Sequence, residues 1–447
     1  MNRILGIGLT IFVLAGCETV QMARELQQQK PAVFQPGERT VTPAEVGIQP
    51  GQKLTLAELE KIAMFAHPSV LQAKKNVELA ELDVKFVKAD YQPTFAVNAG
   101  YQHGTYNRSV HDLSWRSKGS FQGALSFDLL LWDFGRTDAK INQAVQQLIA
   151  AEKNERGVEN KVLLDVRLAD SAVKRALALH RVAVQSVAQY KEHLDQMKER
   201  FTVGKGTEYD RMKAEVDWSQ SELDATITSN NIETSKANLT RCLGFADEIS
   251  IEVADGEVTH FTNTVEELMA RARENEPTLA ALRANVQAAS QYIDQTVAEL
   301  YPELRLSVGG NASGVGWPLL WNLAGVGLLT QNVYNGGRDM LAIQDAMARL
   351  QVARSKVAEY EQTLYYNLRK AQLDAQRAKD SLEVARRSEK LAEDNLRIVN
   401  ERFNVGKASS IERTDAQVQH SNAQAAVVTA IYDDRDAQVQ IAYLIGE

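Results

Sequence analysis

Two acidic residues in this sequence, Glu412 and Asp415, have a spacing that could support chemistry. They lie three positions apart just after an expected chain reversal, so a helix starting there would place both carboxylates on one face. Asp210 occupies the position corresponding to Glu412 near an earlier, similar reversal, where Lys213 replaces the second acid. Repeated around an assembly, such carboxylates would form a ring that favours cations. The residues by themselves favour the simpler alternative, in which acids in the first turns complement the helix dipole.

The sequence contains no convincing catalytic constellation. The patterns HExxH, GxSxG and CxxC are absent, and the glycine-rich stretch GGNASGVG (309–316) lacks the lysine and hydroxyl residue of a phosphate-binding loop, so a hairpin loop is predicted there. The seven histidines are scattered; His103 and His111 fall on a predicted loop between strands and give only a weak metal pattern. We therefore predict no catalytic residues, no metal site, no cofactor and no enzymatic activity. A net charge of −8 gives no basis for binding nucleic acid.

The N-terminus reads as a targeting signal. MNR supplies positive charge, ILGIGLTIFVLA is apolar but too short for a permanent membrane helix, and LAGC ends at Cys17. LAGC resembles a bacterial lipoprotein box, which implies a signal peptide over 1–16, lipidation of Cys17 and an anchored linker over 17–53. Glu18 after the cysteine points to the outer membrane. The alternative is an ordinary secretory signal in which Cys17 occurs by chance. The other cysteine, Cys242, is expected to be a small apolar residue on a helix rather than a reactive thiol.

The remaining chain contains a duplication. RFTVGK (200–205) matches RFNVGK (402–407), and LWDFGR (131–136) matches VYNGGR (333–338), each pair 202 positions apart (402 − 200 and 333 − 131). Further upstream, Pro93 matches Pro302 at an offset of 209, so the first copy carries seven extra residues somewhere between Pro93 and Leu131. The predicted repeats span 54–244 and 264–447, with 245–263 as their linker.

Each repeat is predicted to hold two strands, within about 94–128 and about 303–331. Apolar residues alternate with small or polar ones in FAVNAGYQ (95–102), SFQGALSF (120–127) and RLSVGGN (305–311). Residues 322–330 are assigned as a strand mainly by analogy with the first repeat. Such alternation is typical of membrane-barrel strands, although a half-buried strand of a soluble sheet would look alike.

Long helices are predicted after each strand pair, over 136–201 and 338–403. Their ends show the 3-4 apolar spacing of coiled-coil packing. A helix over 137–201 would be ~97 Å long, while helices over 207–243 and 68–91 would be ~55 Å and ~36 Å. Since the two shorter lengths sum to nearly the longer one, the long helix can run away from the strands, reverse at VGK and be covered by both short helices.

The small number of strands means that a membrane barrel would need several copies of the chain. Four strands cannot close a membrane barrel, whose smallest forms have eight, and open edges are not tolerated in lipid. Two chains would give eight strands with an interior filled by side chains, and three would give twelve with a lumen.

These features together resemble the TolC family of outer-membrane efflux proteins. The resemblance rests on the duplication, on LTLAELEKIAMFAHPSV leading to YQP, on LWDFGR and VYNGGR, and on the RFxVGK turns, and it covers about 54–446. It implies a mainly α fold with a membrane β-barrel portion: a homotrimer with a twelve-stranded barrel in outer-membrane lipid and a long coiled-coil helical barrel in the periplasm. It implies a passive export duct opened by a periplasmic adaptor and an energised inner-membrane pump.

The resemblance also assigns roles to residues. Glu412, Asp415 and Asp210 would line the periplasmic gate, and the turns would contact the adaptor through Val203, Gly204, Lys205, Val405, Gly406 and Lys407. The chain departs from the family in having lysines after the turn glycines and Ala408 in place of a basic residue. Whether Arg413 compensates for that loss is left open, as is the choice between small-molecule efflux and type I secretion. The alternative function is a periplasmic coiled-coil adaptor or scaffold lipoprotein without a pore.

Overall fold

The computed structural model describes residues 20–28, 52–109, 112–245, 251–253, 264–316 and 318–446. The chain divides into two compact units, 1–42 and 43–447. In the first unit residues 20–28 are helical, and Cys17 lies outside the described residues.

The two repeats contain the same series of elements. The first repeat consists of α2 (Leu56–Ala66), α3 (Pro68–Lys88) with a 3-10 turn (Ala89–Tyr91), β2 (Thr94–Ser109), β3 (Asp112–Trp132), α4 (Arg136–Thr202) and α5 (Glu208–Cys242). The second consists of α6 (Val265–Asn275), α7 (Pro277–Ala298), β5 (Glu303–Gly314), β6 (Leu320–Thr330), α8 (Arg338–Asn404) and α9 (Ser410–Ile445). Two short strands that the sequence did not indicate, β1 (Gln52–Leu54) and β4 (Ile251–Val253), pair in parallel.

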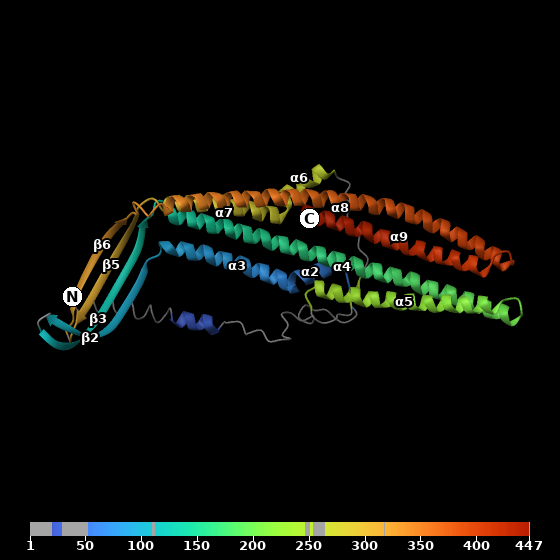
Figure 1. Cartoon of the computed structure of the whole chain (residues 1–447), viewed down its shortest axis with the longest axis horizontal. Coiled ribbons are helices and arrows are strands. Elements are labelled where there is room, and N and C mark those ends of the chain that lie inside the picture. The colour runs from blue at the N-terminus through green and yellow to red at the C-terminus, as the bar shows by residue number, and fades with distance from the viewer. Residues whose placement is uncertain are drawn as a thin grey trace. The chain divides into compact units, whose positions relative to one another are not determined.

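The long helices match the prediction to within a residue at each end. α4 and α8 each contain 67 residues, about 100 Å at the helical rise. Figure 1 shows the strands at one end of the helices and the α4–α5 and α8–α9 reversals at the other. As predicted, α4 packs against both α3 and α5. No helix in the described ranges is both long and apolar enough to cross a lipid bilayer.

A tight left-handed turn connects the sheet to each long helix. In the first repeat Phe134 (φ 54°) and Gly135 (φ 87°) are left-handed, and in the second Gly336 (φ 61°) and Gly337 (φ 77°) take their places. A non-glycine residue in this region is strained. Phe134 is held there by stacking on the Tyr301 ring, with centroids 5.6 Å apart. Both repeats thus use two successive left-handed residues in this turn, although the first is Phe134 in one repeat and Gly336 in the other.

The four long strands form one antiparallel sheet in the order β2-β3-β5-β6. The register places apolar side chains across from one another, as in the pairs Phe95–Phe127 and Tyr101–Phe121, whose rings are both 5.0 Å apart. Polar side chains such as Gln102 and Gln122 share the opposite face. The strand assigned by analogy is confirmed as β6. Its position makes β2 and β6 the two edges of the sheet within this chain.

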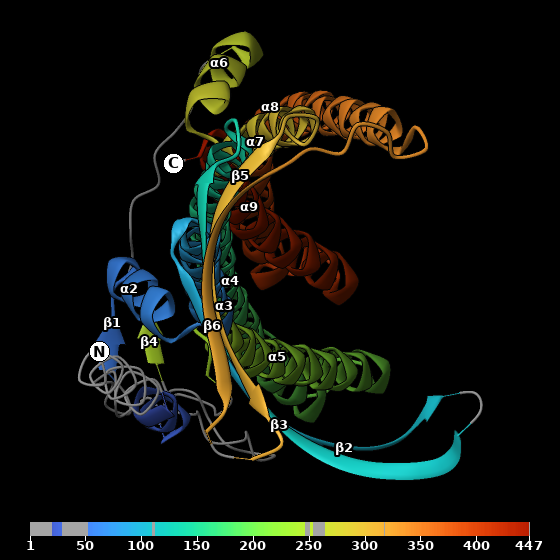
Figure 2. The same cartoon turned by 90° about the vertical axis from the view of Figure 1, so that its left-hand side faces the viewer.

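Two expectations about the loops between strands are wrong. His103 lies inside β2, because the extra residues of the first repeat extend the hairpin rather than its loop; His111 lies outside the described residues. In Figure 2 the β2–β3 hairpin extends beyond the β5–β6 hairpin. Residues 309–314 of the glycine-rich stretch belong to β5, where small side chains still allow ladder pairing. The expected loop is therefore confined to the residues after Gly314.

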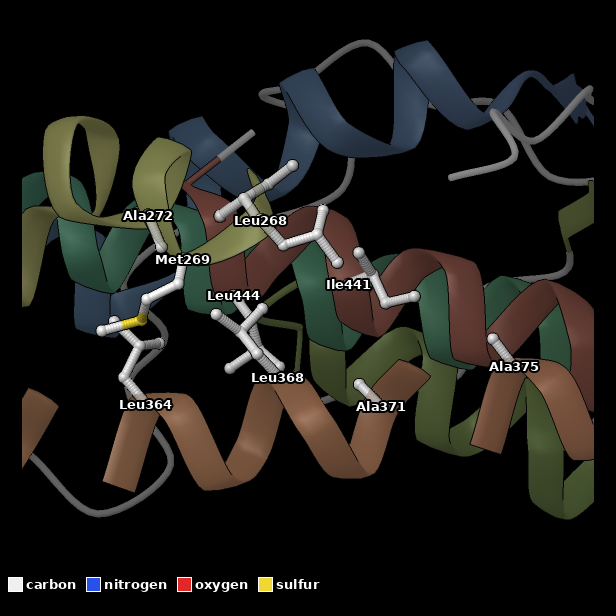
Figure 3. Packing of buried hydrophobic residues seen from close by; sticks show 10 residues of the cluster. Leu268, Met269, Ala272, Leu364, Leu368, Ala371, Ala375, Ile441 and Leu444 are labelled. Carbon is white, nitrogen blue, oxygen red and sulfur yellow. The ribbon is translucent and has the colours of Figure 1, made fainter. Parts of the chain in front are cut away.

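Small helices cover the middle of the long ones. Figure 3 shows α6 packing onto α8 and α9, with Leu268 and Met269 facing Leu364, Leu368 and Ile441. Helix α7 packs on both long helices, and its alanines contact α4 of the other repeat; this contact involves Ala150, Ala281 and Ala284. The repeats are therefore intertwined rather than separate. Cys242 is buried, and burial raises the pKa of its thiol, as a structural cysteine requires.

Candidate functional site: the two hairpin tips

Both hairpins reverse through the same capped turn. Gly204 (φ 71°) and Gly406 (φ 74°) are left-handed, as the repeated phrase predicted. The amide of Lys205 donates to the Arg200 carbonyl at 2.9 Å and that of Lys407 to the Arg402 carbonyl at 2.8 Å, closing the helix ends. Val203 and Val405 are about two-thirds exposed, at 67% and 68%. Each tip thus presents an apolar side chain next to a lysine.

Two of the three predicted gate acids, Asp210 and Glu412, are the third helical residues of capping boxes. In α5 the Thr207 hydroxyl donates to Asp210 Oδ2 at 2.6 Å and accepts from the Asp210 amide at 3.1 Å. In α9 Ser409 and Glu412 make the same reciprocal pair, at 3.3 and 3.2 Å. These are capping boxes, readable in the sequence as Thr-x-x-Asp and Ser-x-x-Glu. Sequence reasoning had noted only the dipole, not the box.

The remaining acid, Asp415, is exposed on α9 one turn further along. It makes no ion pair within the described part of the chain, whereas Glu412 lies 3.7 Å from Arg402. In the first repeat Lys213, at the position of Asp415, is bonded to Asp217 at 2.6 Å. The two tips are therefore chemically unequal, as the sequence indicated.

Arg413 lies between the two acids in sequence but contacts the other repeat. Its Nη1 lies 3.1 Å from His193 Nδ1 and donates to Gln196 Oε1 at 2.5 Å, both on α4. Its guanidinium lies 5.2 Å from the centre of the Phe403 ring, and Arg200 lies 4.1 Å from the same ring. Burial lowers the pKa of Arg413. The sequence could not reveal this cluster, because its members are more than 200 positions apart.

His193 is the most perturbed group at the tips. It is 4% exposed, and its Nε2 lies 3.2 Å from Ser410 Oγ. Burial, followed by the nearby Arg413 cation, lowers the pKa of His193 to about 4. The imidazole is therefore neutral at physiological pH. Next to it, a cavity of about 190 Å³ lies between α4, α8 and α9 and is lined in part by Tyr190 and Asn400.

The contact between α4 and α9 continues away from the tips through polar pairs. Gln417 donates to Gln189, and Ser186 and Ser421 are hydrogen-bonded at 2.9 Å. Further along, buried Asp170 accepts from Lys174 at 2.8 Å and from Arg435 at 3.1 Å. The seam between the repeats is thus hydrogen-bonded along this stretch. No group of three or more His, Cys, Asp or Glu side chains suited to a metal ion occurs among the described residues.

Comparison with known proteins shows similarity in both sequence and fold to outer-membrane proteins. The family model described as outer membrane efflux protein matches residues 62–245 and 268–447. The outer membrane efflux protein BepC of Brucella suis is 22% identical over 374 residues, covering 81% of this chain and 78% of its own. A Pseudomonas aeruginosa membrane protein of known structure superposes with a TM-score of 0.78 at 18% identity, covering 93% of this chain and 99% of its own. The outer membrane protein VceC of Vibrio cholerae superposes at 0.75 with 17% identity, covering 88% and 96%.

Proposed function

Because the chain belongs to the outer membrane efflux protein family, we propose that it is the passive exit duct of a tripartite export system. Its role in the outer membrane is transport rather than catalysis. The observation that carries the proposal is the combination of an antiparallel sheet with two edges, β2 and β6, and long helical hairpins leading away from it. The cargo is chosen elsewhere, by the pump and adaptor.

The sheet supports assembly as a homotrimer. Within one chain four strands leave the outer edges of β2 and β6 without a ladder, which lipid does not tolerate. Three chains joined edge to edge would form twelve strands, enough to leave a lumen. The apolar face of the sheet supports contact with outer-membrane lipid: Val97, Tyr101 and Leu323 are all more than half exposed in the single chain.

The acids at the tips would form the periplasmic gate. In a trimer Glu412 and Asp415 supply six carboxylates, and Asp210 supplies three more nearby. The capping boxes support this role, since they hold Glu412 and Asp210 in fixed orientations at the helix starts. A ring of this kind would favour cations and obstruct the lumen until the tips separate.

The tip turns would contact a periplasmic adaptor, which in turn joins an inner-membrane transporter. Exposed Val203 and Val405 support this proposal, together with Lys205 and Lys407. Lipidation of Cys17, after removal of a signal peptide over 1–16, would anchor the segment 17–53 at the outer membrane. Repeats over 54–244 and 264–447, joined by 245–263, would build the duct itself.

Single-channel recording in planar bilayers tests the duct and the gate together. Glu412→Gln/Asp415→Asn is preferable to alanine, because a glutamine oxygen can still accept the Ser409 hydrogen bond that caps α9. We expect small or flickering wild-type currents that become larger and steadier in this variant. Glu383→Gln/Glu389→Gln, which changes two acids of α8 outside the tip, is the matched control and should behave as wild type.

Other outcomes separate the alternatives. A large, steady wild-type current that the double variant leaves unchanged would keep the duct and reject the acidic gate. A folded, heat-resistant protein that never conducts would favour the scaffold lipoprotein without a pore.

A further inference from the structure

We propose that His193 and Arg413 form a proton-sensitive latch that fastens α9 to α4, and that acidification releases it. The latch joins the second repeat, through the helix bearing Glu412 and Asp415, to the long helix of the first. Its effect on conduction rests on the proposed gate, but the latch itself is a contact between two helices and can be measured without any current.

The hydrogen-bond acceptors of Arg413 are all neutral. Its hydrogen-bond partners are His193 Nδ1 and Gln196 Oε1, and its third neighbour is the Phe403 ring. No carboxylate lies within ion-pair distance of Arg413 in the described part of the chain. Glu192 of α4 lines the same cavity and favours the Arg413 cation from outside ion-pair distance, and it accepts a hydrogen bond from Gln196 at 3.2 Å. Because this carboxylate offsets only part of the desolvation of Arg413, the half-buried cation still depends on each of its neutral acceptors.

The hydrogen bonds fix the protonation state of His193. Because Arg413 can only donate, Nδ1 must be the unprotonated nitrogen, and Nε2 then donates to Ser410 Oγ. A proton added to Nδ1 would remove the acceptor for Arg413. It would also place two cations about 3 Å apart inside a buried cluster. Protonation therefore disfavours the latched arrangement for two reasons, the lost acceptor and the repulsion between the two cations.

The charged surroundings do not reverse this effect. The groups that face His193 are Arg200 of α4, Asp210 and Asp217 of α5, and Arg413 of α9, while α8 contributes the Phe403 ring. The two acids favour the proton, but Asp217 is bonded to Lys213 and Asp210 is engaged in capping α5. Burial and the two arginines prevail, so the pKa of His193 is lowered.

The seam around the latch is suited to separation. Gln189–Gln417 and Ser186–Ser421 can exchange their hydrogen bonds for water at little net cost. The seam within the second hairpin is instead apolar, formed by Leu396, Val399 and Ala416. Loss of the latch should therefore part α4 from α9 near the tips and leave the α8–α9 hairpin intact. Further from the tips the two helices stay joined by the charge cluster around Asp170, and Leu194 and Met197 of α4 still pack near Phe403 of α8.

The size of the effect follows from linkage. If His193 has a pKa of about 4 when latched and its ordinary 6.5 when released, lowering the pH from 7.5 to 5 raises the released-to-latched ratio about 30-fold per protomer. The sign is fixed by the depressed pKa: the latch is intact above pH 6.5 and is lost as the pH falls toward 4.

Spin labels provide a direct test on the full-length assembled protein. Lys198→Cys on α4 and Gln419→Cys on α9 are exposed positions close to the latch, and Cys242 is buried. The labelled parent without these two cysteines gives the background. We expect a single α4–α9 distance at pH 7.5 and a second, longer one at pH 5.

Variants identify the sensor. His193→Gln, which can still accept from Arg413, should keep the short distance at pH 5, and Arg413→Gln should show the longer one already at pH 7.5. His180→Gln is the matched control, since His180 lies on α4 but bonds to Thr228 of α5; it should respond as wild type. Retained heat-resistant oligomers on unboiled gels verify folding.

An unchanged wild-type distance between pH 7.5 and 4.5, or a wild-type response in His193→Gln, would overturn the latch. Parallel conductance recordings separate it from the gate. Separation of the labels without any change in current would support the latch and contradict the acidic gate.

Discussion

At the residue scale, a glycine at equivalent positions ends the last helix of each repeat and lies close to the backbone of another segment. Gly244 and Gly446 follow α5 and α9 with φ of 90° and 83°. A β-carbon on Gly244 would lie 2.7 Å from the Cα of His67, and one on Gly446 would lie 2.7 Å from the carbonyl oxygen of Asn275. Each glycine thus permits the end of a hairpin to pack against the junction of two short helices.

Alanine substitution should distinguish these glycines from those of the tips. At Gly204 the only obstacle is the left-handed backbone, so Gly204→Ala should cost about 1–2 kcal/mol. Gly244→Ala should cost clearly more, because the backbone clash adds to the same strain. Thermal unfolding of both variants measures the difference. Equal losses of stability would show that the backbone at His67 moves away from the added β-carbon at no cost.

At the scale of elements, α4 and α9 are joined by a buried charge cluster as well as by the tip contacts. Asp170 is fully buried, with Lys174 and Arg435 as its cationic partners. Beside it, Arg175 bonds to Asp433 at 3.0 Å and to Asp436 at 2.7 Å. Such a cluster contributes little net stability compared with apolar packing of the same volume, but removal of one partner leaves the others uncompensated.

Removing the central charge should be strongly destabilising. Asp170→Asn would leave the buried Lys174 and the partly buried Arg435 without their shared counter-ion, at a cost of about 3–5 kcal/mol. Asp165→Asn is the matched control, because Lys161–Asp165 has the same i,i+4 spacing on α4 but is exposed, and should cost less than about 1 kcal/mol. Chemical denaturation measures both.

A second substitution checks the cause. Asp170→Asn/Lys174→Met should recover part of the loss, since it removes one uncompensated cation. If the double variant is less stable than Asp170→Asn, lost packing rather than buried charge is responsible.

At the scale of the whole molecule, the two faces of the sheet should tolerate charge differently. Leu323 and Asn322 are neighbours on β6 and therefore point to opposite faces, Leu323 level with Gly310 and Asn322 level with Asn311. In the proposed barrel Leu323 faces lipid and Asn322 faces the lumen.

A lysine at each position tests this arrangement. Leu323→Lys should cost up to about 2–4 kcal/mol in the bilayer and reduce heat-resistant oligomer in the outer-membrane fraction. Asn322→Lys should assemble normally. The reverse order of effects would mean that the faces of the sheet are exchanged, and equal tolerance would argue against a membrane location for the sheet.

The sequence by itself determined the duplication, the long helices, the glycine turns and the strand pairs. These are local or periodic features: a proline-free apolar period, an alternating pattern, or a phrase repeated at a constant offset, each set by the covalent chain and its backbone preferences. The apolar spacing at the ends of the long helices also predicts seams that contain Leu194, Met197, Phe201 and Phe403. Leu194, Met197 and Phe403 are buried, whereas Phe201 is 41% exposed.

Only the tertiary structure decided which surfaces meet. It put α7 against α4 of the other repeat, extended β2 through His103, paired β1 with β4, and turned Arg413 toward His193 while leaving Asp415 exposed. Arg413 and Asp415 are two residues apart, yet opposite faces of one helix give them different environments. A sequence pattern specifies the face on which a residue lies. The partner of that face is chosen by packing between segments about 200 positions apart, and no local preference encodes it.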